Sequence, residues 1–245
     1  MMQMEFSSLP AFRWETIMTH NIDDHLPEPG IVEEPRPPID PYPLSAYVSW
    51  AGRRNRDPIL GVFKTLFPKD GWALELASGS GAHVNYFAPH FPEVTFQPSD
   101  YDEKVFETIS KTRDSQGNKN VVDPIRVDLT NAETWPHAET RLYDVVFVIN
   151  LFQVAPLSIA EGISELASKA LTPRGFLAIY GPFKVDGHYT TESNQNFDQE
   201  ILSKQVPEWG LKDIRDIEKI AGKHGLLLKK QIDLPANNFI LLFSR

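Results

Sequence analysis

Short apolar runs alternate with stretches of helical periodicity from Ser45 to the end of the chain. Five runs rich in β-branched and aromatic residues predict strands: 72–77, 94–100, 124–129, 143–150 and 175–181. Most of them precede a helical pattern, which is typical of a mostly parallel sheet with helices on both faces. Two further runs, 226–234 and 239–245, are separated by a turn too short for a parallel crossover. The pattern therefore predicts a doubly wound, mostly parallel seven-stranded α/β sheet that ends in an antiparallel strand pair.

Three stretches of apolar periodicity predict helices between these strands. The run 57–67 indicates a core helix that begins after Arg54 and Asn55. Ser158 and Glu161 form a capping-box pattern at the start of a second helix. The apolar face of that helix comprises Ile159, Ile163, Leu166 and Ala170. A third helix, within 211–225, ends at Gly225 in the C′ position, and its buried face comprises Ile214, Ile217 and Ile220 or Ala221.

The first 44 residues differ in composition from the rest of the chain. They hold eight of the twenty prolines, which excludes a long helix or a central strand there. We therefore predict a proline-rich arm over 1–44 and one domain over 45–245. A pure linker rarely carries as many large apolar side chains as this arm does. We expect docking over a groove or in a homodimer contact through Phe6, Phe12, Trp14 and Ile17.

Composition excludes several classes of function. The net charge of −9 argues against a general affinity for nucleic acid, which needs clustered Lys and Arg. The absence of cysteine excludes disulfides and thiolate chemistry and is compatible with a reducing compartment. No apolar run approaches the roughly 20 residues of a membrane span. We therefore expect a soluble, cytoplasmic protein with no membrane partner.

Residues 75–83, "ELASGSGAH", place a glycine turn directly behind the first strand. In open α/β sheets such a turn lets a ligand approach the backbone, and both dinucleotides and S-adenosylmethionine bind in this way. The dinucleotide fingerprint needs a third glycine, and Val84 occupies that position after Gly79 and Gly81. The closing antiparallel pair also favours S-adenosylmethionine as the cofactor. A plain tight turn, in which glycine serves only backbone geometry, remains the alternative.

Three carboxylates follow strands where such a ligand would need them. Asp100 lies 19 residues after Gly81 and could accept from a ribose diol, or it could cap a helix starting near Tyr101. Asp128 could accept from the adenine amino group while Leu129 packs on the ring; the alternative is a cap for a short helix. Glu75 points inside the first strand, where we expect it to hold the glycine loop or the ligand's ammonium group.

Other polar residues near the predicted turn could also contact the methyl donor. Arg54 and Asn55 could close over its carboxylate, with a surface salt bridge as the rival explanation. His83 could contact the donor or act as a cap. The candidate donor-binding residues are Arg54, Asn55, Glu75, Gly79, Ser80, Gly81, His83, Asp100, Asp128, Leu129 and Asn150.

From about Tyr47 to Arg245 the chain resembles the methyltransferase-like protein 26 family, a branch of class I S-adenosylmethionine-dependent methyltransferases. The matching stretches are "AGRRNRDPIL" (51–60), "LELASGSGAH" (74–83), "FQPSDYD" (96–102), "YDVVFVIN" (143–150), "LTPRGFLAIYGPF" (171–183), "SNQNFD" (193–198), "PEWGLKD" (207–213) and "LPANN" (234–238). The resemblance implies the Rossmann-like methyltransferase fold and its methyl donor, without a settled substrate. Gln153 stands where the resemblance leads us to expect a histidine, and the arm lies outside it.

Candidates for the chemical step lie after the fourth and fifth strands. Asn150 ends the fourth strand, where its amide could orient an acceptor, or where it could simply form a turn. The polar segment 184–210 has the length of a lid, and its His188 is a candidate base beside Tyr189 and Asn194. The seven histidines show no metal-ligand spacing, so we predict no metal. We predict O- or N-methylation of a small molecule; the alternatives are a non-methylating cyclisation or a non-catalytic binding module.

Overall fold

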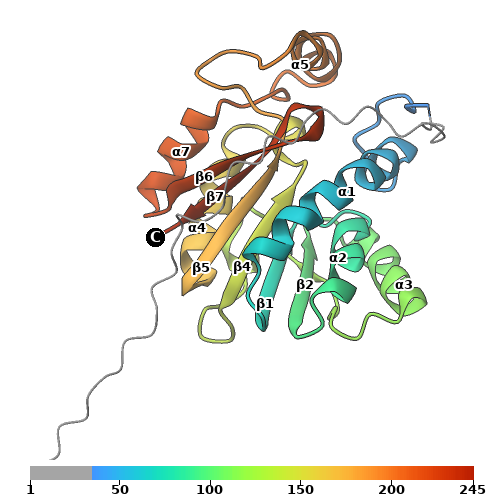
Figure 1. Ribbon diagram of the computed structural model, residues 1–245, viewed down its shortest axis with the longest axis vertical. Coiled ribbons are helices and arrows are strands. Elements are labelled where there is room, and N and C mark those ends of the chain that lie inside the picture. Colours follow the sequence, from blue (N-terminus) through green and yellow to red (C-terminus); the bar gives the residue numbers. More distant parts are fainter. Residues whose placement is uncertain (1–34) are drawn as a thin grey trace, which may run out of the picture. The chain divides into compact units, whose positions relative to one another are not determined.

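The computed structural model describes residues 35–245, which form one seven-stranded sheet in the order β3-β2-β1-β4-β5-β7-β6 (Figure 1). The first five strands are parallel, and β7 runs antiparallel to both β5 and β6. The predicted doubly wound sheet with its antiparallel C-terminal pair is confirmed. The arm residues expected to dock, Phe6, Phe12, Trp14 and Ile17, lie outside the described part of the chain.

Most strands lie where the apolar runs predict them. Their bounds are β1 Gly71–Leu76, β2 Val94–Asp100, β3 Ile125–Arg126, β4 Tyr143–Ile149, β5 Leu171–Gly181, β6 Leu227–Leu234 and β7 Asn238–Ser244. The prediction for 124–129 is wrong in length, because only Ile125 and Arg126 pair with β2. Pro124 has no backbone N–H to give to the ladder, and Asp128 already forms a turn with Thr130.

The helices pack on both faces of this sheet. Their bounds are α1 Ala46–Leu66, α2 Ala82–Phe87, α3 Phe106–Gln116, α4 Ile159–Ala170, α5 Glu192–Asn196, α6 Ser203–Gln205 and α7 Ile214–Lys223. Short 3-10 turns lie at η2 Ala88–His90, η3 Glu103–Val105, η4 Ala132–Thr134, η5 Phe152–Val154 and η7 Pro235–Asn237, and η6 Phe197–Leu202 is π-helical. Within residues 35–245, no helix combines the length and the apolarity needed to cross a bilayer.

The start of α1 differs from the prediction. We expected a core helix over 57–67 that begins after Arg54 and Asn55. The helix instead begins at Ala46, where the Ser45 hydroxyl accepts the Val48 N–H at 3.1 Å, and it continues through Pro58. Arg54 and Asn55 therefore lie inside α1, so both are held by a rigid element.

The predicted capping box of α4 is also wrong, although the helix begins where expected. Ser158 is itself in the helical region and makes no side-chain cap. Backbone carbonyls of the preceding turn accept the first amides instead, and the Glu161 carboxylate binds Lys223 and His224 of the α7 region. The end of α7 agrees with the prediction, because Gly225 follows the helix in the left-handed region.

Neighbouring strand residues contribute to different hydrophobic clusters. Leu74 and Val146 pack with α4 and α7, whereas Ala73 and Phe147 pack with α1 and α2 (Figure 1). Both faces of β1 and β4 are therefore buried, as expected of central parallel strands. Burial on both faces fixes the strand ends, and with them the loops that follow at the carboxyl edge.

Candidate functional site

A tight turn with three left-handed residues follows β1. Ala77, Gly79 and Gly81 have φ values of 53°, 55° and 71°. Ser78 ties the turn to the end of β2, because its N–H donates to the Ser99 carbonyl at 2.8 Å and its hydroxyl accepts the Ser99 N–H at 3.0 Å. The turn is thus held open by hydrogen bonds from the neighbouring strand before any ligand binds.

Glycine is required at position 81 for reasons of both conformation and space. A Cβ there would lie 3.0 Å from Ile109 and 3.1 Å from the Asn85 amide. At Gly79 a Cβ would lie 3.4 Å from Pro43, so residues at the end of the predicted arm reach the turn. Ser80 lies between the two glycines and is partly exposed. The plain-turn alternative accounts for these conformations by itself, and ligand binding by this turn stays a prediction.

Asp100 holds the same turn from the end of β2. Its Oδ2 accepts the Gly79 N–H at 2.9 Å, and its Oδ1 accepts the Asp102 N–H at 3.0 Å. The side chain is buried, and burial raises its pKa. The alternative role as helix cap falls to Asp102, whose carboxylate accepts the Lys104 N–H at the start of η3. Asp100 therefore supports the glycine turn, while its contact with a ribose stays a prediction.

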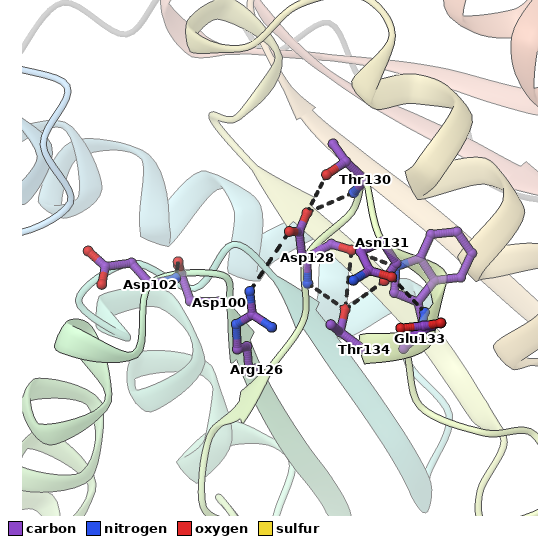
Figure 2. Close-up of polar contacts among 9 residues, drawn as sticks. Asp100, Asp102, Arg126, Asp128, Thr130, Asn131, Glu133 and Thr134 are labelled. Atoms are coloured by element: carbon purple, nitrogen blue, oxygen red, sulfur yellow. Dashed lines mark hydrogen bonds and ion pairs between the residues drawn. The ribbon is translucent and has the colours of Figure 1, made fainter.

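Asp128 forms a local turn after β3 (Figure 2). Its Oδ1 accepts both the N–H and the hydroxyl of Thr130, at 2.9 and 2.7 Å, and these bonds lower its pKa. The short helix predicted here is η4, and Asn131 caps it. Figure 2 shows Arg126 reaching toward the second carboxylate oxygen, at 3.9 Å. The alternative role of Asp128 as the cap of this helix is therefore wrong: Asp128 closes the turn before it, and its contact with adenine stays a prediction.

Leu129 lies within this turn and packs against the cluster beneath α4. Its backbone carbonyl lies against Gly162, where a Cβ would be only 1.8 Å from the carbonyl oxygen. Helix α4 therefore approaches the backbone too closely for any side chain at that point. This close contact fixes the position of the 128–130 turn relative to the carboxyl ends of the strands.

Glu75 is buried near the end of β1, with 2% of its surface exposed. The Ser78 hydroxyl donates to the Glu75 backbone carbonyl at 3.4 Å, while the side-chain Oε2 has no hydrogen-bond partner among the described residues. Burial raises its pKa to about 8, and the nearby Asp100 carboxylate adds to the rise. A buried acceptor without a donor is costly, so the position favours a cationic or donor group from outside the chain.

His83 and Asn55 form a buried polar link between α2 and α1. The His83 Nε2 lies 2.7 Å from the Asn55 Oδ1, and the Asn55 side chain also bonds Tyr180 of β5. Burial lowers the pKa of His83 to about 4, and the charge of Arg56 lowers it further. His83 is therefore neutral near pH 7 and acts as a hydrogen-bonding group. Arg54 is exposed on α1, with its guanidinium 4.9 Å from the Trp50 ring centroid.

Asn150 directly follows β4 and is in the left-handed region, with φ 57°. Its backbone N–H donates to the Tyr180 carbonyl at 2.9 Å, which matches the turn alternative. Its side-chain amide has no hydrogen-bond partner within residues 35–245. The amide is therefore free to contact a ligand at the carboxyl edge of β4.

His188 and Tyr189 lie apart from the glycine turn. His188 is exposed in a tight hairpin and exchanges backbone hydrogen bonds with Val185. The Tyr189 hydroxyl donates to Asp198 at 2.6 Å, and Lys184 binds the same carboxylate oxygen at 3.0 Å. Neither side chain hydrogen-bonds Asn150 or the turn. His188 is therefore a solvent-exposed loop residue in this structure, and its role as a base stays a prediction.

The polar segment after β5 also contacts the last hairpin. Asn194 is buried, and its amide donates to Thr190 at 2.9 Å and to the Asn237 carbonyl at 3.3 Å. The turn before β7 therefore reaches this segment. Sequence reasoning missed Asp198, since a lone acid in a polar stretch gives no sign that it becomes buried beside Lys184. Within the described chain, no cluster of three or more potential metal ligands occurs.

Comparison with known proteins agrees with this architecture. The profile of one family, described as "Protein of unknown function (DUF938)", matches residues 47–245. Among solved structures, the chain resembles a methyltransferase of calicheamicin biosynthesis in its SAH-bound form, at TM-score 0.65 and 12% identity over 81% of this chain and 55% of that one. It also resembles an O-methyltransferase family 2 protein from Planctomyces limnophilus in complex with apigenin, at TM-score 0.65 and 15% identity over 81% and 60%.

A third similar structure is the mitomycin 7-O-methyltransferase, at TM-score 0.65 and 14% identity over 81% of this chain and 57% of that one. The chain thus spans 55% to 60% of the length of these three proteins. At these identities the likeness establishes the fold, which is the Rossmann-like fold of class I methyltransferases.

Proposed function

The chain belongs to the DUF938 family, and from its structure we propose that it binds S-adenosylmethionine and transfers a methyl group to a small molecule. The observation that carries this proposal is the unpartnered, buried Oε2 of Glu75 beside the glycine turn. S-adenosylmethionine carries an ammonium and a sulfonium group, so its positive charge is complementary to this carboxylate. A ligand with neither a positive charge nor a hydrogen-bond donor at this point would leave Glu75 Oε2 without a partner.

The surrounding residues fit the rest of the donor. The Gly79–Gly81 turn lets the amino-acid portion approach the backbone, with Ser80 between the glycines. Asp100 would meet the ribose hydroxyls, and Asp128 with Leu129 would meet the adenine. On α1 and α2 the proposed donor contacts are Arg54, Asn55 and His83.

When bound, the donor supplies a methyl group on a positively charged sulfur. The chain then has to hold the acceptor in line with that methyl group and keep water away, since alignment alone lowers such a barrier substantially. The free amide of Asn150 could orient the acceptor atom. For an acceptor that must lose a proton, His188 is the proposed base and Tyr189 its neighbour; His188 would have to move from its exposed hairpin.

Several properties favour a small acceptor rather than a polymer. The net charge of −9 disfavours nucleic acid, and the polar segment 184–210 suits a lid over a small ligand. Two of the similar structures, the mitomycin 7-O-methyltransferase and an O-methyltransferase family 2 protein in complex with apigenin, support a small acceptor. We also propose that the chain is related to the methyltransferase-like protein 26 family and that it is located in the cytoplasm. The arm's role in the acceptor site or in a homodimer stays a prediction.

Calorimetric titration with S-adenosylhomocysteine tests the cofactor. We expect saturable binding to wild type and to Gly117→Ala, and none to Gly81→Ala. Both glycines have positive φ, 68° and 71°, but only at Gly81 would a Cβ meet neighbours, so the pair separates backbone strain from damage to the turn. Absence of binding to wild type would overturn the proposal, and binding of NAD instead would revive the dinucleotide alternative.

The fate of the donor tests the reaction. Protein incubated with labelled S-adenosylmethionine and the small-molecule fraction of a cell extract should place label in small molecules and release S-adenosylhomocysteine. Label only in protein or RNA would contradict the acceptor class. Substrate conversion with an unchanged donor would support a cyclisation, and binding without turnover would support a binding module.

A further inference from the structure

Gln153 carries the second buried oxygen without a partner near the carboxyl edge of the sheet. It lies in η5, directly after β4, and only 9% of its surface is exposed. Its Oε1 has no hydrogen-bond partner among the described residues. Buried amide oxygens in folded proteins are nearly always hydrogen-bonded, so this exception calls for a donor that the chain does not supply.

The orphan oxygen lies next to the end of β5. A Cβ built on Gly181 would be 3.5 Å from the Gln153 Oε1 and 3.4 Å from the Phe183 ring. These are ordinary van der Waals distances, so the amide oxygen lies directly beside the end of β5. Asn150, with its free amide, lies three residues before Gln153 and directly after β4. The carboxyl ends of adjacent strands are where ligands bind in open α/β sheets.

The backbone around Gln153 is firmly held. Its carbonyl accepts the Gly210 N–H at 3.0 Å, which ties η5 to the segment after β5. Phe152, its neighbour, is fully buried and packs edge-on against Phe183. Gly210 is fixed in turn by the Lys212 ammonium, which donates to its carbonyl at 2.8 Å. The side chain therefore starts from a preorganised position rather than from a loose loop.

We propose that Gln153 binds the acceptor substrate, its Oε1 accepting a hydrogen bond from the hydroxyl or amino group that becomes methylated. This inference rests on the proposed methyl transfer. The acceptor class it implies is an alcohol, phenol or amine that still carries its proton when it binds. In the transfer, the acceptor atom gives a lone pair to the methyl carbon and the sulfur keeps the electron pair of the broken bond. The acceptor's proton passes to water, or to the proposed base His188 where the acceptor must lose it during the transfer.

An amide suits this task because it orients without titrating. A hydrogen bond from the acceptor's O–H or N–H fixes the direction of the remaining lone pair, which must point at the methyl carbon. A glutamine side chain cannot remove the proton. The acceptor atom must therefore attack the methyl carbon while it still carries its proton, and it loses that proton as the transfer is completed. An acceptor without a donor hydrogen would leave Oε1 unpaired and would bind more weakly.

The first test needs no substrate. Gln153→Met keeps the length of the side chain and removes the orphan oxygen. If Oε1 stays unpaired until the acceptor substrate binds, the ligand-free variant should melt about 2 to 4 °C above wild type, as expected when an unsatisfied polar group is removed. A lower melting temperature would show that the amide has a structural partner, and would overturn the proposal. Gln231→Met, at an exposed position on β6, controls for the substitution itself.

The second test measures turnover with labelled S-adenosylmethionine and the small-molecule fraction of a cell extract. Gln153→Met should lower label transfer at least about 10-fold while S-adenosylhomocysteine affinity stays within about 2-fold of wild type. Unchanged transfer in the variant would overturn the role of Gln153 alone. A wild type that binds no S-adenosylhomocysteine would overturn the proposed function, and the melting result would still decide whether the amide has a structural partner.

Discussion

Replacing Glu75 with glutamine removes a carboxyl group that the fold buries without a complete set of partners. In the folded chain its pKa rises from the ordinary 4.5 to about 8, chiefly because burial disfavours the charged form. The unfolded chain releases this proton near pH 4.5, whereas the folded chain retains it until about pH 8. The stabilising contribution of the neutral carboxyl is therefore complete below pH 4.5 and is lost as the pH rises through 8.

Each pH unit in this window corresponds to about 1.4 kcal/mol, so wild type should lose about 4 kcal/mol relative to Glu75→Gln between pH 5 and pH 8. Urea unfolding of both proteins, without ligand, at half-unit pH steps measures this difference. Glu218→Gln, at an exposed position on α7, serves as the matched control and should track wild type. Parallel stability profiles for wild type and Glu75→Gln would refute the assignment of a raised pKa to this buried carboxyl.

Two further predictions concern the turns around the site. Gly162→Ala should destabilise the protein by about 3 kcal/mol or more, because the new Cβ would lie 1.8 Å from the Leu129 carbonyl oxygen. Gly222→Ala, with open space around it, should instead stabilise the protein by about 0.5 to 1 kcal/mol. Urea unfolding of both variants measures the difference. Asp100→Ala should weaken S-adenosylhomocysteine binding at least about 10-fold by calorimetry. The backbone N–H groups of Gly79 and Asp102 would lose their hydrogen-bond acceptor, and the ribose would lose its proposed partner. Equal affinity in wild type and variant would contradict this role of Asp100.

The sequence predicts the order and type of the strands because both faces of the central strands are buried, which gives continuous apolar runs. It fails where a local signal is overridden. Pro58 suggests a helix start, yet the Ser45 cap and the buried face of α1 extend the helix through it. Pro124 shortens β3 because the ladder needs an N–H that proline lacks. Ser158 carries the pattern of a capping box, but Glu161 finds stronger partners on α7.

For the site, the sequence predicts the glycine turn because its conformational demand is local. It cannot identify partners that only folding brings near, such as Ser99 beside Ser78 or Tyr180 beside Asn55. Gln153 draws attention in the sequence only as an unexpected residue. The unpaired state of its oxygen becomes visible only in the folded chain, where the oxygen is buried beside Gly181.

A crystal structure of the wild-type chain with S-adenosylhomocysteine tests the central claim most directly. The account predicts that the ligand's ammonium group lies against the Glu75 carboxylate and its amino-acid portion against the Gly79–Gly81 turn. The ribose should then meet Asp100 and the adenine Leu129. A ligand bound elsewhere, or one that leaves Glu75 without a partner, would contradict the proposal that this turn binds the methyl donor.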